Sequence, residues 1–93
     1  IVMFGTPWCP ACKRARSFFD ANGLKRQERD VDRDLQARAE LKILTGKGSV
    51  PVFLVDGRLV QGFREESMMR ALLVSVERRL GSKGISVRKA EGP

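Results

Sequence analysis

The residues of this chain best suited to chemistry are its two cysteines, Cys9 and Cys12, which lie three positions apart in the run Cys-Pro-Ala-Cys. A Cys-x-x-Cys pair that follows a strand and opens a helix is typical of thiol–disulfide exchange. Free N–H groups and the dipole at a helix start stabilise a thiolate, the reacting form of cysteine. We therefore expect Cys9 to have the lower pKa and to attack, and Cys12 to be less exposed and to resolve.

In the expected cycle, the Cys9 thiolate attacks a disulfide sulfur, and Cys12 then displaces the reduced product from Cys9. Lys13, Arg14 and Arg16 follow within two helical turns, and their positive charge should further favour the thiolate. The exchange needs no metal and no organic cofactor. The alternative of two structural cysteines that never react is disfavoured, because cytosolic pairs of this kind are usually catalytic or metal-binding.

Other chemistries that use cysteine are excluded by composition. The Cys-x-x-Cys spacing also forms half of a zinc site, but the chain has no further cysteine and no histidine to complete four ligands. The same lack of histidine excludes a Cys-His or Ser-His catalytic pair within the chain. We expect no metal site.

Hydrophobic patterning predicts the elements that must position the dithiol. They are a buried strand over 1–4, a helix over about 9–22, a polar strand within 24–31, a helix capped by Asp32 or Asp34 and ended at 45–48, a strand over 50–55, its hairpin partner over 58–61, and a helix from about 65 to 81. Asp56-Gly57 is a strong two-residue hairpin signal. The order β-α-β-α-β-β-α predicts an α/β fold with a four-stranded mixed sheet.

Two helices carry apolar stripes that should face the core. In the first helix the stripe consists of Ala11, Ala15, Phe18 and Phe19. In the last helix it consists of Met69, Leu72, Leu73, Val76 and Leu80. The middle helix has two possible faces, one through Leu35 and one through Ala37.

Pro51 is unusual because proline seldom lies inside a central strand. It fits the start of the strand over 50–55, and a cis bond there would expose a backbone edge beside the dithiol. The alternative is a tolerated strand-start proline without a role.

Two motifs resemble the glutaredoxin family. Residues 6–14, Thr-Pro-Trp-Cys-Pro-Ala-Cys-Lys-Arg, look like the glutaredoxin active-site loop and first helix, and Ser49-Val50-Pro51 looks like its Thr-Val-Pro segment with a cis proline. The resemblance extends over about residues 1–80 and implies a thioredoxin-like fold with Cys9 as nucleophile. The binding residues expected from the resemblance and its neighbourhood are Thr6, Trp8, Pro10, Lys47, Val50, Pro51, Gly62, Phe63 and Arg64.

The sequence departs from the family pattern where glutathione would bind. Many glutaredoxins have a lysine at the position of Thr6, and a ring at the position of Ala11. The family's Gly-Gly and following aspartate are replaced here by Gly62-Phe63-Arg64, which looks like the Gly-Phe-Arg segment of NrdH-type redoxins. Those proteins take electrons from thioredoxin reductase and supply ribonucleotide reductase. Phe63 is either a docking contact or an ordinary loop anchor.

These observations predict a glutaredoxin-like oxidoreductase that reduces protein or glutathione mixed disulfides. Glutathione is the expected co-substrate, with Lys47 placed to meet one of its carboxylates, and no resident cofactor is expected. The alternative is an NrdH-type electron carrier reduced by thioredoxin reductase. Iron–sulfur carriage is disfavoured by Pro10, since cluster-bridging glutaredoxins usually lack that proline.

Length and charge bound the remaining possibilities. The 93 residues predict one domain over 1–81 followed by a basic, flexible tail over 82–93. The net charge of +7 could attract nucleic acid, but few aromatics accompany it, so we expect disulfide-containing client proteins and no nucleic-acid partner. No long apolar segment or signal peptide is visible, and we expect a cytoplasmic monomer without membrane contact.

Overall fold

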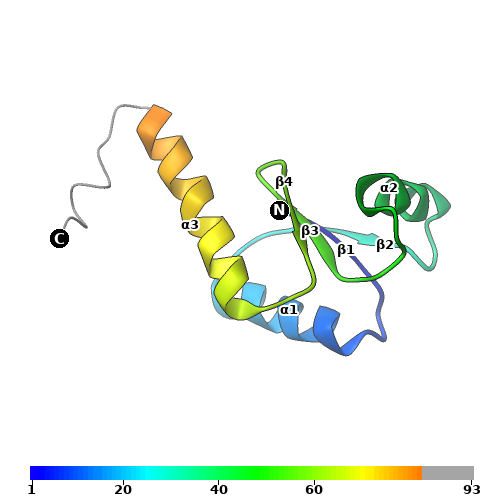
Figure 1. Ribbon diagram of the computed structural model, residues 1–93. Helices are drawn as coiled ribbons and strands as arrows, with labels where there is room; N and C mark the ends of the chain where they lie inside the picture. The colour runs from blue at the N-terminus through cyan, green and yellow to red at the C-terminus, as the bar shows by residue number, and fades with distance from the viewer. Residues whose placement is uncertain (83–93) are drawn as a thin grey trace.

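The elements of the computed structural model, which describes residues 1–82, follow the predicted order (Figure 1). They are β1 (Val2–Gly5), α1 (Pro10–Ala21), β2 (Gln27–Asp30), α2 (Leu35–Thr45), β3 (Val52–Val55), β4 (Arg58–Gln61) and α3 (Glu65–Ser82). The predicted α/β class is confirmed. The last helix runs one residue past its predicted end at Gly81, and the tail predicted over 82–93 otherwise lies outside the described residues.

The four strands form one mixed sheet in the order β2-β1-β3-β4. β1 and β2 are parallel, as a helical crossover between them requires, whereas β3 is antiparallel to both of its neighbours. Asp56 and Gly57 connect β3 to β4 with φ values of 55° and 83°. Positive φ at both central residues is what a two-residue hairpin with right-handed strand twist demands, so the predicted turn is confirmed.

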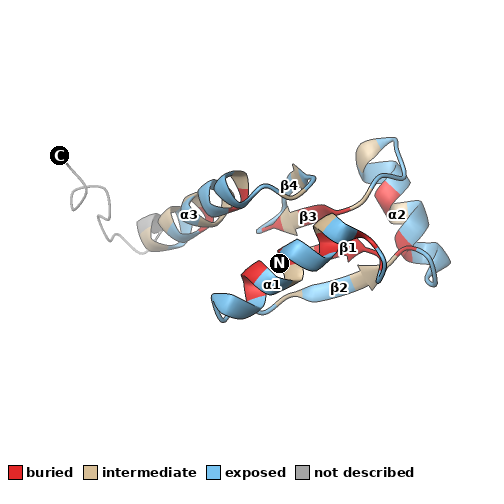
Figure 2. Ribbon diagram, turned by 90° about the horizontal axis from the view of Figure 1, so that it is seen from below, coloured by how far each residue is buried: buried red, intermediate tan, exposed pale blue. Residues whose placement is uncertain are grey.

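Alternating side chains of the central strands face two separate layers of helix. Met3 of β1 and Phe53 of β3 pack with α1 and α3, while Phe4 and Val52 pack with α2. Figure 2 shows the buried residues concentrated on β1, β3 and the inner sides of the helices. The dithiol belongs to the first of these two core clusters, so its packing depends on α1, α3 and the sheet together.

Local capping explains where α1 and α2 begin. Cys9 is the N-cap of α1 and Pro10 its first residue, as predicted, because proline's fixed φ and missing N–H suit that position. Asp34 caps α2 by accepting hydrogen bonds from the N–H groups of Gln36 and Ala37 at 3.0 and 3.2 Å. Of the two faces considered for α2, the one through Ala37 is buried, whereas Leu35 is 76% exposed.

The predicted core face of α3 is partly wrong. Met68 and Ser75 are buried, whereas Met69, Leu73 and Val76 are about half exposed. The reason is that α3 carries apolar residues on two faces and lies on the sheet with the face through Met68. Ser75 is buried on this face, and its hydroxyl is satisfied by donating to the Asp56 carboxylate at 2.8 Å.

β2 is shorter and more polar than a core strand, which explains its weak sequence signal. It occupies only 27–30 of the predicted 24–31 and lies at an edge of the sheet, with one paired neighbour. Its side chains form ion pairs to α1 and α2 instead of packing in the core. Of the helices in residues 1–82, none combines the length and hydropathy of a membrane-spanning segment.

Candidate active site: the dithiol at the start of α1

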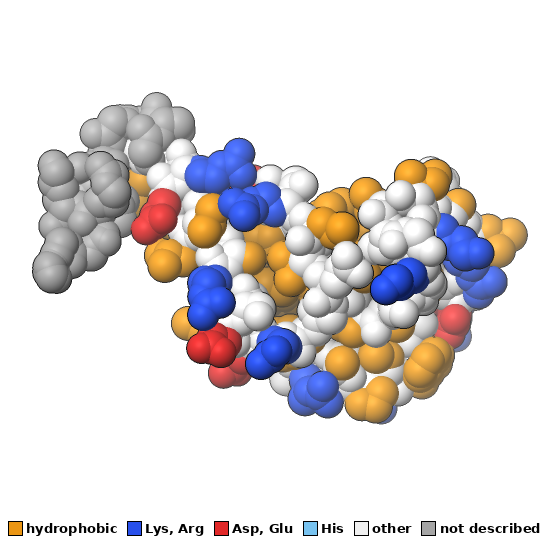
Figure 3. All heavy atoms as spheres, viewed as in Figure 1, with side chains coloured by type: hydrophobic (Ala, Val, Ile, Leu, Met, Phe, Trp, Pro, Cys, Tyr) orange, Lys and Arg blue, Asp and Glu red, His pale blue; other side chains and the backbone are white. Residues whose placement is uncertain are grey.

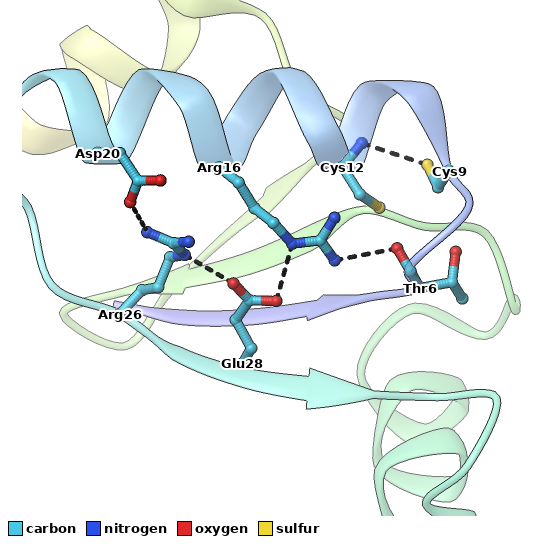
Figure 4. A network of polar contacts seen from close by, with 7 residues as sticks. All are labelled: Thr6, Cys9, Cys12, Arg16, Asp20, Arg26 and Glu28. Carbon is cyan, nitrogen blue, oxygen red and sulfur yellow. Dashed lines mark hydrogen bonds and ion pairs between the residues drawn. The ribbon is translucent and has the colours of Figure 1, made fainter.

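The two cysteines differ because they occupy different positions in the same helical turn (Figure 4). Cys9 is the N-cap, and its Sγ accepts a hydrogen bond from the backbone N–H of Cys12 at 3.3 Å. Cys12 lies inside the turn and is fully buried, whereas Cys9 is 6% exposed. Both are free thiols. Cys12 is thus the less exposed cysteine, as the sequence predicts.

Their pKa values move in opposite directions. Burial raises the pKa of Cys9, but hydrogen bonds from Cys12 and Ala11 and the charge of Arg16 outweigh it and leave that pKa below its ordinary value. Burial, together with the hydrogen bond to Cys9, raises the pKa of Cys12 to about 11. This is the predicted order, with Cys9 as the thiol that ionises first. Of the three basic residues predicted to assist, Arg16 contributes.

The loop before Cys9 is fixed by contacts on both sides. The Thr6 carbonyl accepts a hydrogen bond from the Arg16 guanidinium at 2.9 Å, and the Trp8 indole N–H donates to the Asp32 carboxylate at 2.6 Å. Trp8 is 64% exposed, so this bond orients a large aromatic surface next to Cys9. The Thr6 side chain is buried and its hydroxyl has no partner among the described residues. Thr6 therefore supports this loop through its backbone carbonyl, while its side chain is buried.

A line of ion pairs connects this loop to β2 (Figure 4). Arg16 pairs with Glu28 at 2.9 Å, Glu28 pairs with Arg26 at 2.8 Å, and Arg26 pairs with Asp20 at 2.8 Å. Glu28 and Arg26 are residues that the sequence analysis did not single out, and it considered Asp32 only as a cap of α2. No local spacing indicates them, because their partners lie on other elements.

The segment around Pro51 borders the first core cluster. The Val50–Pro51 bond is cis, and the Pro51 carbonyl accepts a hydrogen bond from the Gly62 N–H at 2.8 Å. Val50 packs against both core clusters. The hydrogen bond from Gly62 to Pro51 joins the end of β4 to the start of β3. It brings two of the predicted binding segments together.

Gly62, Phe63 and Arg64 have three different environments. Gly62 has a φ of 75°, which a side chain would strain. Phe63 is half-buried, and its ring lies 5.6 Å from that of Phe18 and 6.3 Å from that of Phe53. Arg64 is exposed, and its carbonyl accepts the Met68 N–H in the first turn of α3. Of the two interpretations of Phe63, these ring contacts fit the loop anchor.

Two further predicted binding residues, Pro10 and Lys47, lie on the surface. Lys47 follows α2, and its ammonium has no ion-pair partner within residues 1–82. An open hollow of about 680 Å³ lies between α1 and the start of α3, lined by Lys13, Arg14, Ser17, Phe18, Ala21, Asn22, Phe63 and Glu65. It contains neither cysteine, so we do not assign it to the exchange site. In the part of the chain that the structure describes, no three Cys, Asp or Glu side chains gather to hold a metal ion.

Comparison with known proteins gives one consistent family. A family model for glutaredoxin matches residues 1–60. The chain is 37% identical over 62 residues to a glutaredoxin of Pseudomonas aeruginosa, covering 67% of this chain and 74% of that protein. It is 29% identical over 65 residues to an uncharacterized glutaredoxin-like 8.6 kDa protein in the rubredoxin operon of Clostridium pasteurianum, covering 70% and 87%.

Among solved structures, the thioredoxin-like protein BC3987 is similar in fold and in sequence. It aligns with a TM-score of 0.70 and 31% identity, covering 76% of this chain and 97% of that chain. The similarity therefore extends over nearly the whole of that smaller protein.

Proposed function

The chain belongs to the glutaredoxin family of the thioredoxin-fold superfamily, and from that premise we propose that it is a thiol–disulfide oxidoreductase that reduces protein or glutathione mixed disulfides through Cys9 and Cys12. The resemblance noted in the sequence is thereby confirmed. The observation that carries the proposal is the asymmetry of the dithiol. Cys9 caps α1 and has a lowered pKa, whereas Cys12 is fully buried and has a pKa raised to about 11. Exchange requires that asymmetry, because the thiolate is the nucleophile.

The proposed cycle is balanced in bonds, protons and electrons. The Cys9 thiolate attacks one sulfur of the client disulfide, a new S–S bond forms, and the client's other sulfur leaves as a thiolate that takes up a proton. Cys12 then loses its proton and attacks Cys9 Sγ, which releases the second client thiol. The client has gained two electrons, and the protein is left with a Cys9–Cys12 disulfide. No resident cofactor takes part.

We propose glutathione as the co-substrate that returns the disulfide to the dithiol. Two molecules of glutathione supply the two electrons and leave as glutathione disulfide. A carboxylate of glutathione could pair with the unpaired ammonium of Lys47, and the exposed indole of Trp8 borders the approach to Cys9. Thr6 is buried and contributes no side chain to this contact.

The second candidate is an electron carrier of the NrdH type, reduced by thioredoxin reductase. Gly62-Phe63-Arg64 favours it, because Arg64 is exposed where glutathione-using relatives are expected to carry an acid. A buried Thr6 in place of a lysine removes a second cation from the glutathione site. A dithiol that must stay reduced also suits a reducing compartment, and for either donor we propose the cytoplasm.

NADPH-coupled reduction of a small disulfide tests the function and separates the two donors. One reaction contains glutathione and glutathione reductase, and the other contains thioredoxin reductase. Turnover with glutathione supports the first candidate, and turnover with the reductase alone supports the second. Cys9→Ser should be inactive in both, whereas Cys12→Ser should accumulate a stable mixed disulfide visible by mass spectrometry. Silence in both reactions, or a fully active Cys9→Ser, would contradict the proposal.

A further inference from the structure

We propose that Glu28 is a positioning residue for the dithiol: from β2 it holds the Arg16 guanidinium against the Thr6 carbonyl, and so fixes the loop that presents Cys9. The inference rests on the proposed function, because it concerns the same reactive thiol. Glu28 touches neither cysteine and acts through Arg16.

The geometry gives Arg16 two tasks at once. Its Nε donates to Glu28 Oε1 at 2.9 Å, while its terminal nitrogen donates to the Thr6 carbonyl at 2.9 Å. Arg16 lies on α1, one turn after Cys12, so the guanidinium joins the helix that carries the dithiol to the loop that precedes it. A planar guanidinium can make both bonds only in one orientation, and the bond to Glu28 selects that orientation.

Glu28 is itself held in place. Its second carboxylate oxygen accepts from Arg26 Nε at 2.8 Å, and Arg26 is anchored by Asp20 of α1 at 2.8 Å (Figure 4). Burial raises the pKa of Glu28, but hydrogen bonds from Arg16 and Arg26 outweigh it and leave that pKa below its ordinary value. Glu28 is therefore a carboxylate at neutral pH. A fixed carboxylate on a strand is a rigid support for a flexible arginine.

The charged groups around Arg16 come from two elements, α1 and β2. A hollow of about 430 Å³, separate from the one between α1 and α3, is lined by Arg16 and Glu28. Lys13 of α1 lines it too, together with Arg29 and Asp30 of β2. Arg29 is directed to α2, where it pairs with Glu40 at 2.8 Å. Burial raises the pKa of Cys9, hydrogen bonds from Cys12 and Ala11 lower it, and the positive charge of Arg16 lowers it further.

Positioning and bare charge make opposite predictions for one substitution. Removing the negative charge of Glu28 without moving Arg16 would leave more positive charge near Cys9 and make its thiol ionise at lower pH. If Glu28 positions Arg16, glutamine replaces a charge-assisted bond with a weaker neutral one, which loosens the guanidinium, weakens its effect on Cys9 and makes the thiol ionise at higher pH. The sign of the shift therefore separates the two explanations.

The test is the pH dependence of Cys9 alkylation by iodoacetamide, followed by peptide mass mapping in the reduced full chain. For Glu28→Gln we expect the midpoint to rise by about half a pH unit, which is less than the shift of about 1–3 that a directly adjacent charge produces, because Glu28 acts on Cys9 only through Arg16. Glu40→Gln is the matched control, because it removes a carboxylate that pairs an arginine of β2 at the same 2.8 Å on the α2 side. Its midpoint should equal that of the parent.

Arg16→Lys is the second variant, and it decides the question if Glu28→Gln does not fold. Lysine keeps the charge but cannot make the two bonds of the guanidinium. If Arg16 acts by its position, the alkylation midpoint of Cys9 should rise; if it acts by its charge alone, the midpoint should not change. In the double variant Glu28→Gln/Arg16→Lys we expect no rise beyond that of Arg16→Lys alone. An unchanged or lowered midpoint in folded Glu28→Gln, or in Arg16→Lys, would overturn the inference.

This test is independent of the function assay. Alkylation needs neither a client disulfide nor an electron donor, so a parent that fails in the coupled reactions would still report the positioning of Arg16. Conversely, an active parent whose Glu28 variant keeps its midpoint would retain the proposed function and lose only the role of Glu28.

Discussion

Replacing Gly5 with alanine tests how tightly the resolving cysteine is packed. Gly5 is the last residue of β1, and a Cβ there would lie 3.0 Å from Cys12 Sγ and 3.2 Å from Met3 Cε. Met3 Cε is the end of a flexible side chain and can move aside. Cys12 Sγ is fully buried, so it has little room to move away from the new methyl group.

The expected cost follows from two opposing effects. Overpacking a well-packed core costs about 1–3 kcal/mol. Replacing glycine with alanine at an unstrained position returns about 0.4–1 kcal/mol by restricting the unfolded chain. We therefore expect Gly5→Ala to lower the free energy of unfolding by about 1–2 kcal/mol. For a domain of this size that corresponds to a Tm lower by roughly 4–16 °C.

Thermal unfolding of the reduced protein, followed by circular dichroism, measures this effect. Gly48→Ala is the matched control, because a Cβ at that glycine would meet no atom within 4 Å among the described residues. We expect its Tm to equal or slightly exceed that of the parent. Gly5→Ala should also slow the release of a mixed disulfide from Cys9. If both alanine variants melt together, the space above Cys12 is looser than the structure indicates and the reasoning fails.

Three further predictions concern thiol reactivity and local packing. At pH 7.5 iodoacetamide should label Cys9 and spare Cys12, because the pKa of Cys9 lies below its ordinary value and that of Cys12 is raised to about 11. Equal labelling of the two cysteines in the folded chain would contradict this. In denaturant, both cysteines should react. Asp34→Ala should cost about 1 kcal/mol in urea unfolding by removing the α2 cap, and Asp34→Asn should cost less. Phe63→Ala should lower the free energy of unfolding by about 2–3 kcal/mol, because two ring contacts are lost. Trp8→Ala, at an exposed side chain, should lower it by less than half of that. The reverse order would disprove the interpretation of Phe63 as a loop anchor.

Much of the fold could be predicted from sequence because its signals are local. Pro10 and Asp34 mark helix starts through hydrogen bonds within one turn, and Asp56-Gly57 marks a hairpin through backbone conformation. Such signals depend only on neighbouring residues, and the structure agrees with them. The strand predicted within 24–31, and found at 27–30, has the weakest sequence signal because an edge strand needs few apolar residues.

The face of α3 could not be predicted because it depends on a distant partner. The apolar residues of this helix suit two faces that differ by a small rotation. The buried face carries Met68 and Ser75, and the Ser75 hydroxyl donates to the Asp56 carboxylate 19 positions earlier. A buried serine reads as polar in a hydrophobic pattern, so periodicity favoured Leu73 and Val76, which are about half exposed.

The same division holds at the site. Cys9 and Cys12 could be placed from their spacing and from the proline between them. The support from Arg16 to Glu28 could not, because it joins residues 12 positions apart on different elements. Figure 3 shows Lys and Arg side chains spread over the visible face, so net charge alone does not indicate which cation matters.

The asymmetry of the dithiol comes from helix N–H hydrogen bonding at Cys9 and from burial at Cys12. The Cys12 N–H donates to Cys9 Sγ because a helix leaves its first N–H groups free, and Cys9 is the residue at that end. The bond stabilises a thiolate at Cys9, while burial keeps the proton on Cys12. An exchange catalyst needs one thiol that reacts at once and another that reacts only after the mixed disulfide has formed. A Cys-x-x-Cys at a helix start supplies both, and the arginine held by β2 adds a support that the motif itself does not encode.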